Sequence, residues 1–191
     1  MKKFGFLLFL LAIAVMLGGS ALAQDNSVYF TTYFSNANTA NAPDATLRMI
    51  NDGDTGSTLY ADIYVFDDSE ELTECCSCYV TPDGLLAESV NGSLTHNPIT
   101  HIKPTRGVIK VISSSTPLAG SLTGTAVTPT PGLRGWATHV QQTVSSYALT
   151  ETLLEDSNLT GDELYALQRL CYFDALLSGL PCSCTLEDQA F

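Results

Sequence analysis

Residues 59–66, LYADIYVF, carry the clearest strand signal in this chain. The odd-numbered residues of the segment are all apolar, whereas the even-numbered residues are large or polar. Successive side chains of a strand point to opposite faces of its sheet, so this alternation places Leu59 and Ile63 on one face and Asp62 and Tyr64 on the other. The segment therefore predicts a β-strand with one face in a hydrophobic core.

Further segments have the same texture of alternating or β-branched residues. Clusters of Gly, Asn, Asp, Pro and Ser separate them, and these residues favour turns. In 134–142 the alternation places Trp136, Thr138 and Val140 on one side and His139 on the other, which we expect to face solvent. These additional strands are expected at residues 27–34, 46–51, 107–113, 134–142 and 147–153.

Residues 161–178 are predicted to form a helix. Thr160 and Glu163 make a T-x-x-E capping box, in which each side chain can satisfy a free backbone amide at the helix start. Asp174 falls within the apolar face of this helix, so either the helix frays there or the carboxylate has a partner. That face consists of residues at helical spacing, namely Leu164, Leu167, Leu170 and Cys171.

Many short strands followed by one late helix predict a mainly β protein, an antiparallel β-sandwich with one C-terminal α-helix. An immunoglobulin-like sandwich is one arrangement that fits this pattern. The sequence contains no internal repeat, coiled coil or nucleotide-binding pattern. We expect residues 24–191 to form a single domain, because a chain of this length can bury its own core.

The first 23 residues have the organisation of a cleaved secretory signal. Lys2 and Lys3 precede an almost unbroken apolar run, and Ala21-Leu22-Ala23 supplies the small residues that a signal peptidase requires. A membrane anchor is the alternative, but the run is shorter than the roughly 20 apolar residues of a spanning helix. We expect residues 1–23 to be removed and the mature protein, without a stable membrane span, to be secreted or periplasmic.

The chain is strongly acidic, with 20 Asp and Glu residues against 8 Lys and Arg and a formal net charge of −12. Loss of the two positive charges of Lys2 and Lys3 with the signal would take this charge from −12 to −14. Such a balance repels nucleic acid and anionic lipid headgroups, so we expect no nucleic-acid partner. It would favour a cationic partner or divalent ions, whereas a solvated acidic surface is the simpler interpretation.

Six cysteines lie in two groups of three, and an even number in an exported chain predicts disulfides. Adjacent Cα atoms are about 3.8 Å apart, closer than the roughly 4.4 to 6.8 Å of a normal bridge, so Cys75 and Cys76 should not bond each other. Bridges between the groups would clamp the helix and tail to the segment after residue 66, which we expect to be a loop. The candidates are Cys75, Cys76, Cys78, Cys171, Cys182 and Cys184.

A zinc site is the alternative use of the same cysteines. Zinc sites built on thiolates usually have paired C-x2-C knuckles, whereas the spacings here are C-C-x-C and C-x10-C-x-C. An oxidising compartment also removes free thiolates. We therefore expect disulfides, with no resident metal or cofactor on these residues.

Two acidic segments invite a comparison with calcium sites. Residues 51–56, NDGDTG, lack the D-x-[DN]-x-[DN]-G frame and the closing glutamate of a calcium loop, so a strand-connecting turn is the simpler interpretation. A second group of carboxylates precedes the cysteines, and either a divalent cation or a solvated loop would accommodate their repulsion. This group is Asp67, Asp68, Glu70, Glu71 and Glu74.

The sequence has no catalytic signature with the correct spacing. It contains neither a G-x-S-x-G elbow nor an H-E-x-x-H motif. The three histidines, His96, His101 and His139, show no arrangement with a nucleophile and an acid. His96 and His101 flank a proline-containing loop and are expected at the surface. The sequence therefore favours a non-catalytic role.

The segment YVFDDSEELTECCSCYVTPDGL, together with PTRGVIKVISS, GWATHVQ and a C-terminal C-x-C, resembles a group of uncharacterised exported bacterial proteins. The resemblance covers most of the mature chain and implies export and a single domain, without an established activity. We expect an exported, non-catalytic envelope or extracellular protein with a structural or binding role. The alternative is an exported metal-dependent protein or hydrolase whose site is assembled from acidic residues and histidines.

Overall fold

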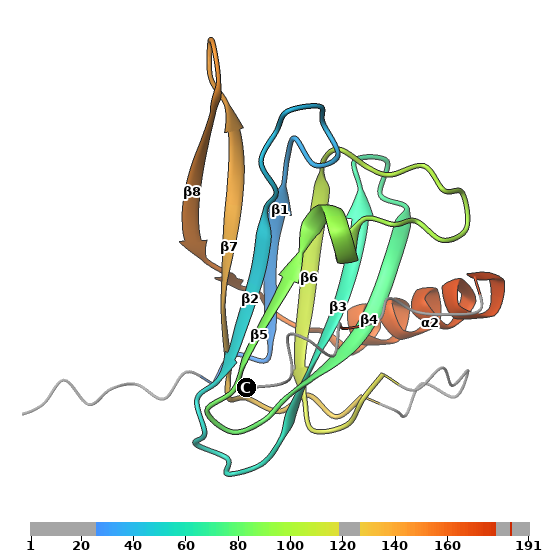
Figure 1. The fold of residues 1–191 in the computed structure, drawn as a ribbon. Coiled ribbons are helices and arrows are strands. Elements are labelled where there is room, and N and C mark those ends of the chain that lie inside the picture. Colours follow the sequence, from blue (N-terminus) through green and yellow to red (C-terminus); the bar gives the residue numbers. More distant parts are fainter. Residues whose placement is uncertain (1–25, 119–126, 179–183, 185–191) are drawn as a thin grey trace, which may run out of the picture.

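The computed structural model describes residues 26–118, 127–178 and 184. Two antiparallel sheets face each other across a hydrophobic core, which confirms the expected β-sandwich (Figure 1). The expected signal, residues 1–23, lies outside the described residues, as does Cys182. Within the described ranges, no helix has the length and apolar character that crossing a membrane requires.

The first sheet has five strands in the order β4-β3-β6-β1-β9. Their bounds are β1 Tyr29–Phe34, β3 Leu59–Asp67, β4 Leu72–Val80, β6 Gly107–Ser114 and β9 Glu155–Asp156. The second sheet has four strands in the order β5-β2-β7-β8. Their bounds are β2 Thr46–Asn51, β5 Leu85–Ser89, β7 Leu133–Gln142 and β8 Tyr147–Leu153. A π-helical turn, η1 (Val90–Leu94), follows β5, and α2 (Gly161–Ser178) follows β9.

Strand β3 has the two faces that its alternation predicts. Leu59 and Ile63 are fully buried in the cluster between the sheets, whereas Tyr64 is fully buried in a second cluster on the other face. Both faces are covered because α2 packs on the side of the sheet that turns away from the sandwich interior. All the strands expected from the sequence are present, each within two residues of its expected bounds.

The segment that carries the first cysteines is a strand, not the loop that the sequence suggested. Strand β4 pairs antiparallel with β3, with Cys76 opposite Ile63 and Cys75 opposite Tyr64. Its alternation places Cys76 and Cys78 in the sandwich core and Cys75 in the cluster under α2. The neighbouring acidic residues obscured this alternation in the sequence. The sequence also provided no prediction for β5, η1 or β9.

Helix α2 begins as expected but uses its capping glutamate differently. The Glu163 backbone amide donates to Thr160 Oγ1 at 3.1 Å, which is one half of the capping box. The Glu163 side chain instead accepts hydrogen bonds from Tyr29 Oη at 2.9 Å and from Lys110 Nζ at 2.6 Å. The helix start is therefore tied to β1 and β6 of the sheet beneath it.

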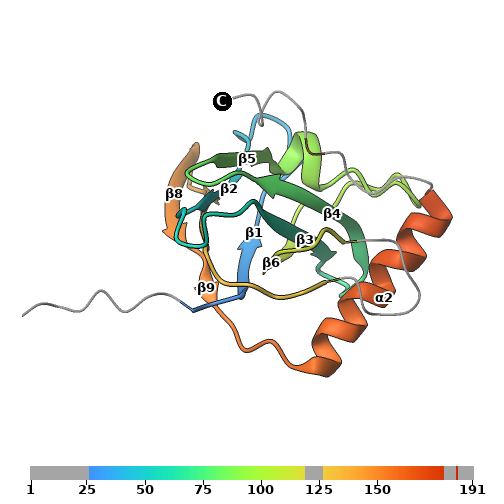
Figure 2. The same ribbon diagram turned by 90° about the horizontal axis from the view of Figure 1, so that it is seen from below.

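Helix α2 lies along the five-stranded sheet on the side of β3 and β4 (Figure 2). Leu167 and Cys171 are buried against the sheet, as their spacing predicts. Leu170 was expected on the same face but is 43% exposed, because the contact with the sheet is narrower than the apolar stripe. Asp174 is buried in an unbroken helix, so of the two alternatives for this residue the helix does not fray there.

Candidate functional site

Two disulfides between described cysteines connect the two cysteine groups, as the sequence predicts. Cys75 is bonded to Cys171 with a Cα–Cα distance of 5.7 Å, and Cys78 is bonded to Cys184 with a Cα–Cα distance of 5.6 Å. Cys76 is also disulfide-bonded, and no described cysteine is free. The first bridge fixes α2 on β4, and the second holds Cys184 against the sandwich core. Disulfides of this kind indicate an oxidising compartment.

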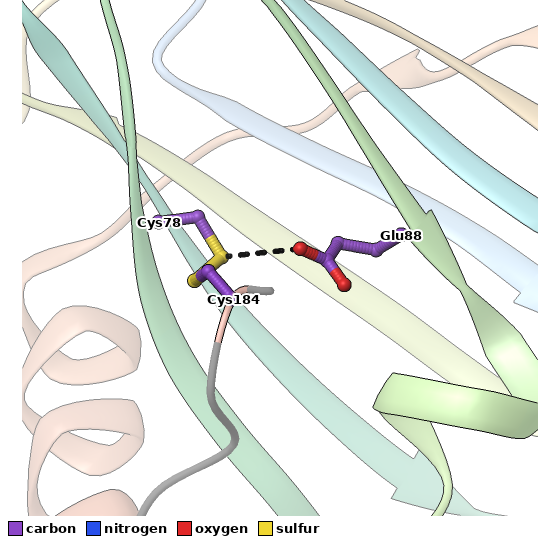
Figure 3. Close-up of side chains that lie close together, drawn as sticks. All are labelled: Cys78, Glu88 and Cys184. Atoms are coloured by element: carbon purple, nitrogen blue, oxygen red, sulfur yellow. Dashed lines mark hydrogen bonds between the residues drawn. A yellow bond between two sulfur atoms is a disulfide. The ribbon is translucent and has the colours of Figure 1, made fainter. Parts of the chain in front are cut away.

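Among the described residues, one group of potential metal ligands consists of the two cysteines of the second bridge and Glu88. Figure 3 shows the Glu88 carboxylate beside the sulfur atoms of Cys78 and Cys184, with Glu88 Oε1 3.9 Å from Cys78 Sγ. Zinc and other soft metals bind the thiolate form of cysteine. Both sulfur atoms are here in a covalent S–S bond, so this oxidised group offers a metal little more than one buried carboxylate.

Several polar side chains of the two acidic segments have local hydrogen-bond or ion-pair partners. Residues 51–56 form the expected turn, in which Asn51 Oδ1 accepts from the Gly53 amide and Asp52 Oδ1 accepts from the Asp54 amide. In the second segment Asp67 Oδ1 caps its own turn, and Asp68 pairs with Arg106 at 2.6 Å. The local turn and an ion pair therefore account for Asp67 and Asp68.

Glu74 departs from the solvated loop that the sequence suggested for it. Its side chain is buried on β4, where it accepts the His96 backbone amide at 3.0 Å. Burial and the charge of Asp174 raise the pKa of Glu74 to about 7, against hydrogen bonds from the His96 and Asn97 backbone that lower it. Burial also raises the pKa of Asp174, to about 6. Both buried carboxyls therefore bind a proton more readily than a carboxyl in solvent.

Asp62 is a further buried carboxyl, on the face of β3 that the sequence assigned to it. Its oxygens accept hydrogen bonds from Ser77 Oγ at 2.6 Å, from Ser114 Oγ at 2.7 Å and from the Leu118 amide at 3.2 Å. Burial raises the pKa of Asp62 to about 7 although these hydrogen bonds lower it. The three donors come from separate segments, so Asp62 joins β4, β6 and the following loop; we interpret it as a structural group.

His139 is buried, whereas the sequence placed it in solvent. Its ring stacks on that of Tyr33, with centroids 4.2 Å apart, and its Nε2 atom lies 2.8 Å from Thr152 Oγ1. Leu133 and Ala137, on the same side of β7 as His139, are buried in the interior cluster, whereas Trp136 and Thr138 on the other side are half-buried. The interior side of β7 is therefore the one that carries His139, and Val140 is buried as well. Burial lowers the pKa of His139, and the Tyr33 backbone opposes this effect. The imidazole is therefore neutral near pH 7.

A cleft of about 350 Å³ opens beside this histidine, between β1 and the β7–β8 pair. We call it the His139 cleft. Its wall combines apolar side chains, threonine hydroxyls, one imidazole and one carboxylate. The lining residues are Thr31, Thr32, Tyr33, Val108, His139, Thr152, Leu153 and Glu155. They belong to β1, β6, β7, β8 and β9, so both sheets contribute to it.

The His139 cleft could not have been found from spacing in the sequence. Its lining residues are spread along the sequence from Thr31 to Glu155. The one feature that the sequence offered was the position of His139 in a predicted strand. His96 and His101, by contrast, are exposed in the loop between η1 and β6, as predicted. Of the three histidines, His139 is the buried one, and it lines the cleft.

Comparisons with known proteins add little to this picture. No family model and no curated protein matches the chain. Among solved structures, the crystal structure of Thermotoga maritima 1070 is similar at 12% sequence identity and a TM-score of 0.45. That match covers 70% of this chain and 97% of the other. A similarity this remote carries no argument about function.

Proposed function

We propose that this protein is an exported, non-catalytic binding protein that holds a small organic ligand in the His139 cleft. The observation that carries the proposal is the cleft itself, a concavity of about 350 Å³ with a mixed polar and apolar wall. Binding sites for small molecules usually have such volumes and a few polar groups among apolar ones. The sandwich supplies a rigid support, because both sheets contribute strands to the wall.

The wall defines the chemistry of the ligand. Tyr33, Val108 and Leu153 offer an apolar surface, and neighbouring threonine hydroxyls offer hydrogen bonds to a polar end. His139 is uncharged, so it would contribute a hydrogen bond or a stacking surface and no ion pair. Glu155 and the net charge of −12 disfavour anions. A neutral or cationic molecule with an aromatic or aliphatic part fits these groups best.

Export belongs to the same proposal. The sequence of residues 1–23 supports a cleaved signal, and the disulfides support an oxidising compartment, so we assign the protein to the periplasm or the outside of a bacterial cell. A binding protein there must keep its site folded outside the cytoplasm. The disulfides that join β4 to α2 and to Cys184 contribute to that stability.

A hydrolase is the second candidate, and one observation favours it. His139 and Glu155 line the same cleft, so a histidine and an acidic residue are present near one another. The hydroxyl that His139 Nε2 contacts is that of Thr152, which would have to be the nucleophile. A secondary hydroxyl is a weak nucleophile when no backbone amides are positioned to stabilise the oxyanion of the transition state, and the described residues show no such site. Binding therefore explains the cleft more simply than catalysis.

The test is an NMR titration of the mature protein with a panel of neutral and cationic small aromatic compounds. We expect amide shifts centred on Thr32, Tyr33 and Leu153, and weaker binding of the cationic compounds to Glu155→Gln. Glu151→Gln is the matched control, because it removes the same charge from the adjoining strand outside the cleft. Absence of shifts at these amides would refute the proposal. Compound turnover that Thr152→Val abolishes would instead establish the hydrolase.

A further inference from the structure

The β7–β8 hairpin differs in charge from the rest of the molecule. It projects beyond the other strands (Figure 1) and spans residues 133–153. In a chain with a net charge of −12, this hairpin has one basic side chain, Arg134, and one acidic side chain, Glu151. Arg134 pairs with Asp52 at 3.5 Å, and Glu151 pairs with Arg48 at 2.7 Å. The hairpin is therefore a neutral projection from an acidic protein.

The outer edge of β8 is open. Strand β8 is the last strand of its sheet and pairs on one side with β7 alone. Natural edge strands are usually protected by lysine, proline, a bulge or a covering segment. Residues 147–153 contain no lysine or proline, their register with β7 is regular, and Leu149 and Leu153 are 54% and 64% exposed. Glu151 is the one charged side chain of β8, and it is paired with Arg48; lysine, proline, a bulge and a covering strand are absent from this edge in the described part of the chain.

The pairing with β7 shows which backbone groups face outward. The Leu154 amide donates to the Gly135 carbonyl, and the Thr143 amide donates to the Ser146 carbonyl. These two pairs stand at opposite ends of the ladder and fix its alternation, in which every second residue of β8 turns its amide and carbonyl toward β7. The alternate residues of β8 turn their amides and carbonyls away from β7, toward the open edge. The outward set is Tyr147, Leu149, Glu151 and Leu153.

We propose that the outer edge of β8 pairs antiparallel with β8 of a second copy of this chain. The occupant follows from charge and symmetry. Two strongly acidic molecules repel each other, and the neutral hairpin is the region where they can approach without repulsion between like charges. A two-fold axis makes an antiparallel edge complementary to itself. The two four-stranded sheets would then join into one continuous sheet. This inference does not depend on the function proposed for the cleft.

The side chains select one register for this pairing. An axis beside Thr150 pairs the whole length of β8, with Leu149 opposite Glu151 of the second copy and Tyr147 opposite Leu153. An axis beside Glu151 would place two glutamates opposite each other and shorten the ladder, and like charges directly opposite are destabilising. We therefore assign the axis to Thr150, where the two threonines would be neighbours.

The experiment is analytical ultracentrifugation of the mature, oxidised protein over a wide concentration range, with three variants. Wild type should dimerise reversibly. Leu149→Glu places like charges opposite Glu151 and should weaken the dimer about fivefold or more. Leu149→Lys at the same position places an opposite charge there and should weaken it less. Leu85→Glu is the control on the other edge of the sheet, because Leu85 is 56% exposed, and should leave the dimer unchanged.

Hydrogen exchange of the unmodified protein provides a second measurement that no folding defect can disturb. The amides of Leu149, Glu151 and Leu153 should gain protection as the concentration rises, while those of Ala148, Thr150 and Thr152 stay protected throughout. A wild-type protein that remains monomeric with unprotected outward amides would overturn the proposal. So would a dimer that Leu149→Glu and Leu85→Glu weaken equally, or outward amides that become protected only when an extended peptide is added.

Discussion

The two ends of the sandwich are built in opposite ways. At the β4 end, disulfides join the strand to α2 and to Cys184, and carboxyls such as Asp62 and Glu74 are buried. At the β8 end, the strand has an exposed edge, and a cleft separates it from β1. We call these the clamped end and the open end. From this difference we expect stability to be concentrated at the clamped end, while the open end carries the binding that we propose.

The largest effect should come from breaking the covalent links of the clamped end. Reduction of all bridges should lower the free energy of unfolding by at least about 4 to 5 kcal/mol in the chain-entropy model, which is the value for the Cys75–Cys171 bridge alone, since it spans 96 residues. Denaturant curves with and without reductant measure this loss. Equal midpoints in the two curves would show that the clamped end owes its stability to packing alone.

Packing of α2 should produce the next largest effect. Leu167 is 1% exposed under the helix, so Leu167→Ala should cost about 2 to 5 kcal/mol. Leu170→Ala is the matched control three residues away, and we expect less than about 1 kcal/mol because Leu170 is 43% exposed. Urea denaturation of both variants makes the comparison. Similar losses would mean that the apolar stripe of α2 is covered in solution more widely than in this structure.

The buried carboxyls should make the clamped end more stable in mild acid. The pKa of Asp62 is raised from 3.8 to about 7 in the folded protein, and that of Glu74 from 4.5 to about 7. The folded state therefore holds protons that the unfolded state releases, and the resulting stability is complete below about pH 4 and is lost as the pH rises through about 7. His139, whose pKa is lowered, acts in the opposite direction.

Thermal unfolding at about pH 5 and about pH 8 measures this dependence. Asp62→Asn should reduce the gain in melting temperature at the lower pH by several degrees, because about 1 kcal/mol corresponds to roughly 2 to 4 °C at this size. The difference between variant and wild type isolates Asp62 from His139 and from the overall charge. A pH dependence identical in both proteins would show that Asp62 keeps an ordinary pKa.

The smallest effect concerns the start of α2. Thr160→Ala removes the hydroxyl that accepts the Glu163 amide and should cost about 1 kcal/mol. Thr160→Ser keeps the oxygen and should be close to wild type in the same denaturant assay. If Ala and Ser variants are equally stable, the contacts of the Glu163 side chain with Tyr29 and Lys110 hold this end of the helix without the cap.

The elements that sequence reasoning found are those whose signal is local. Strand β3 alternates strictly, and α2 has a capping threonine and helical spacing, so neither needs knowledge of its neighbours. Strand β4 was missed because acidic residues and cysteines mask its alternation, and its burial depends on a helix distant along the chain. Glu74 and His139 were placed in solvent for the same reason, since their covering elements, η1 with its following loop and β1, are far away in sequence.

The sequence by itself determined the β-sandwich with a late helix, the acidic character, the expectation of export and the joining of the two cysteine groups. Periodicity, charge and chain geometry act over short distances and can be read residue by residue. Tertiary structure alone decided which carboxyls lose contact with water, where the His139 cleft forms and which strand edge remains open. Burial and strand order depend on segments that meet only after folding, so no local pattern contains them.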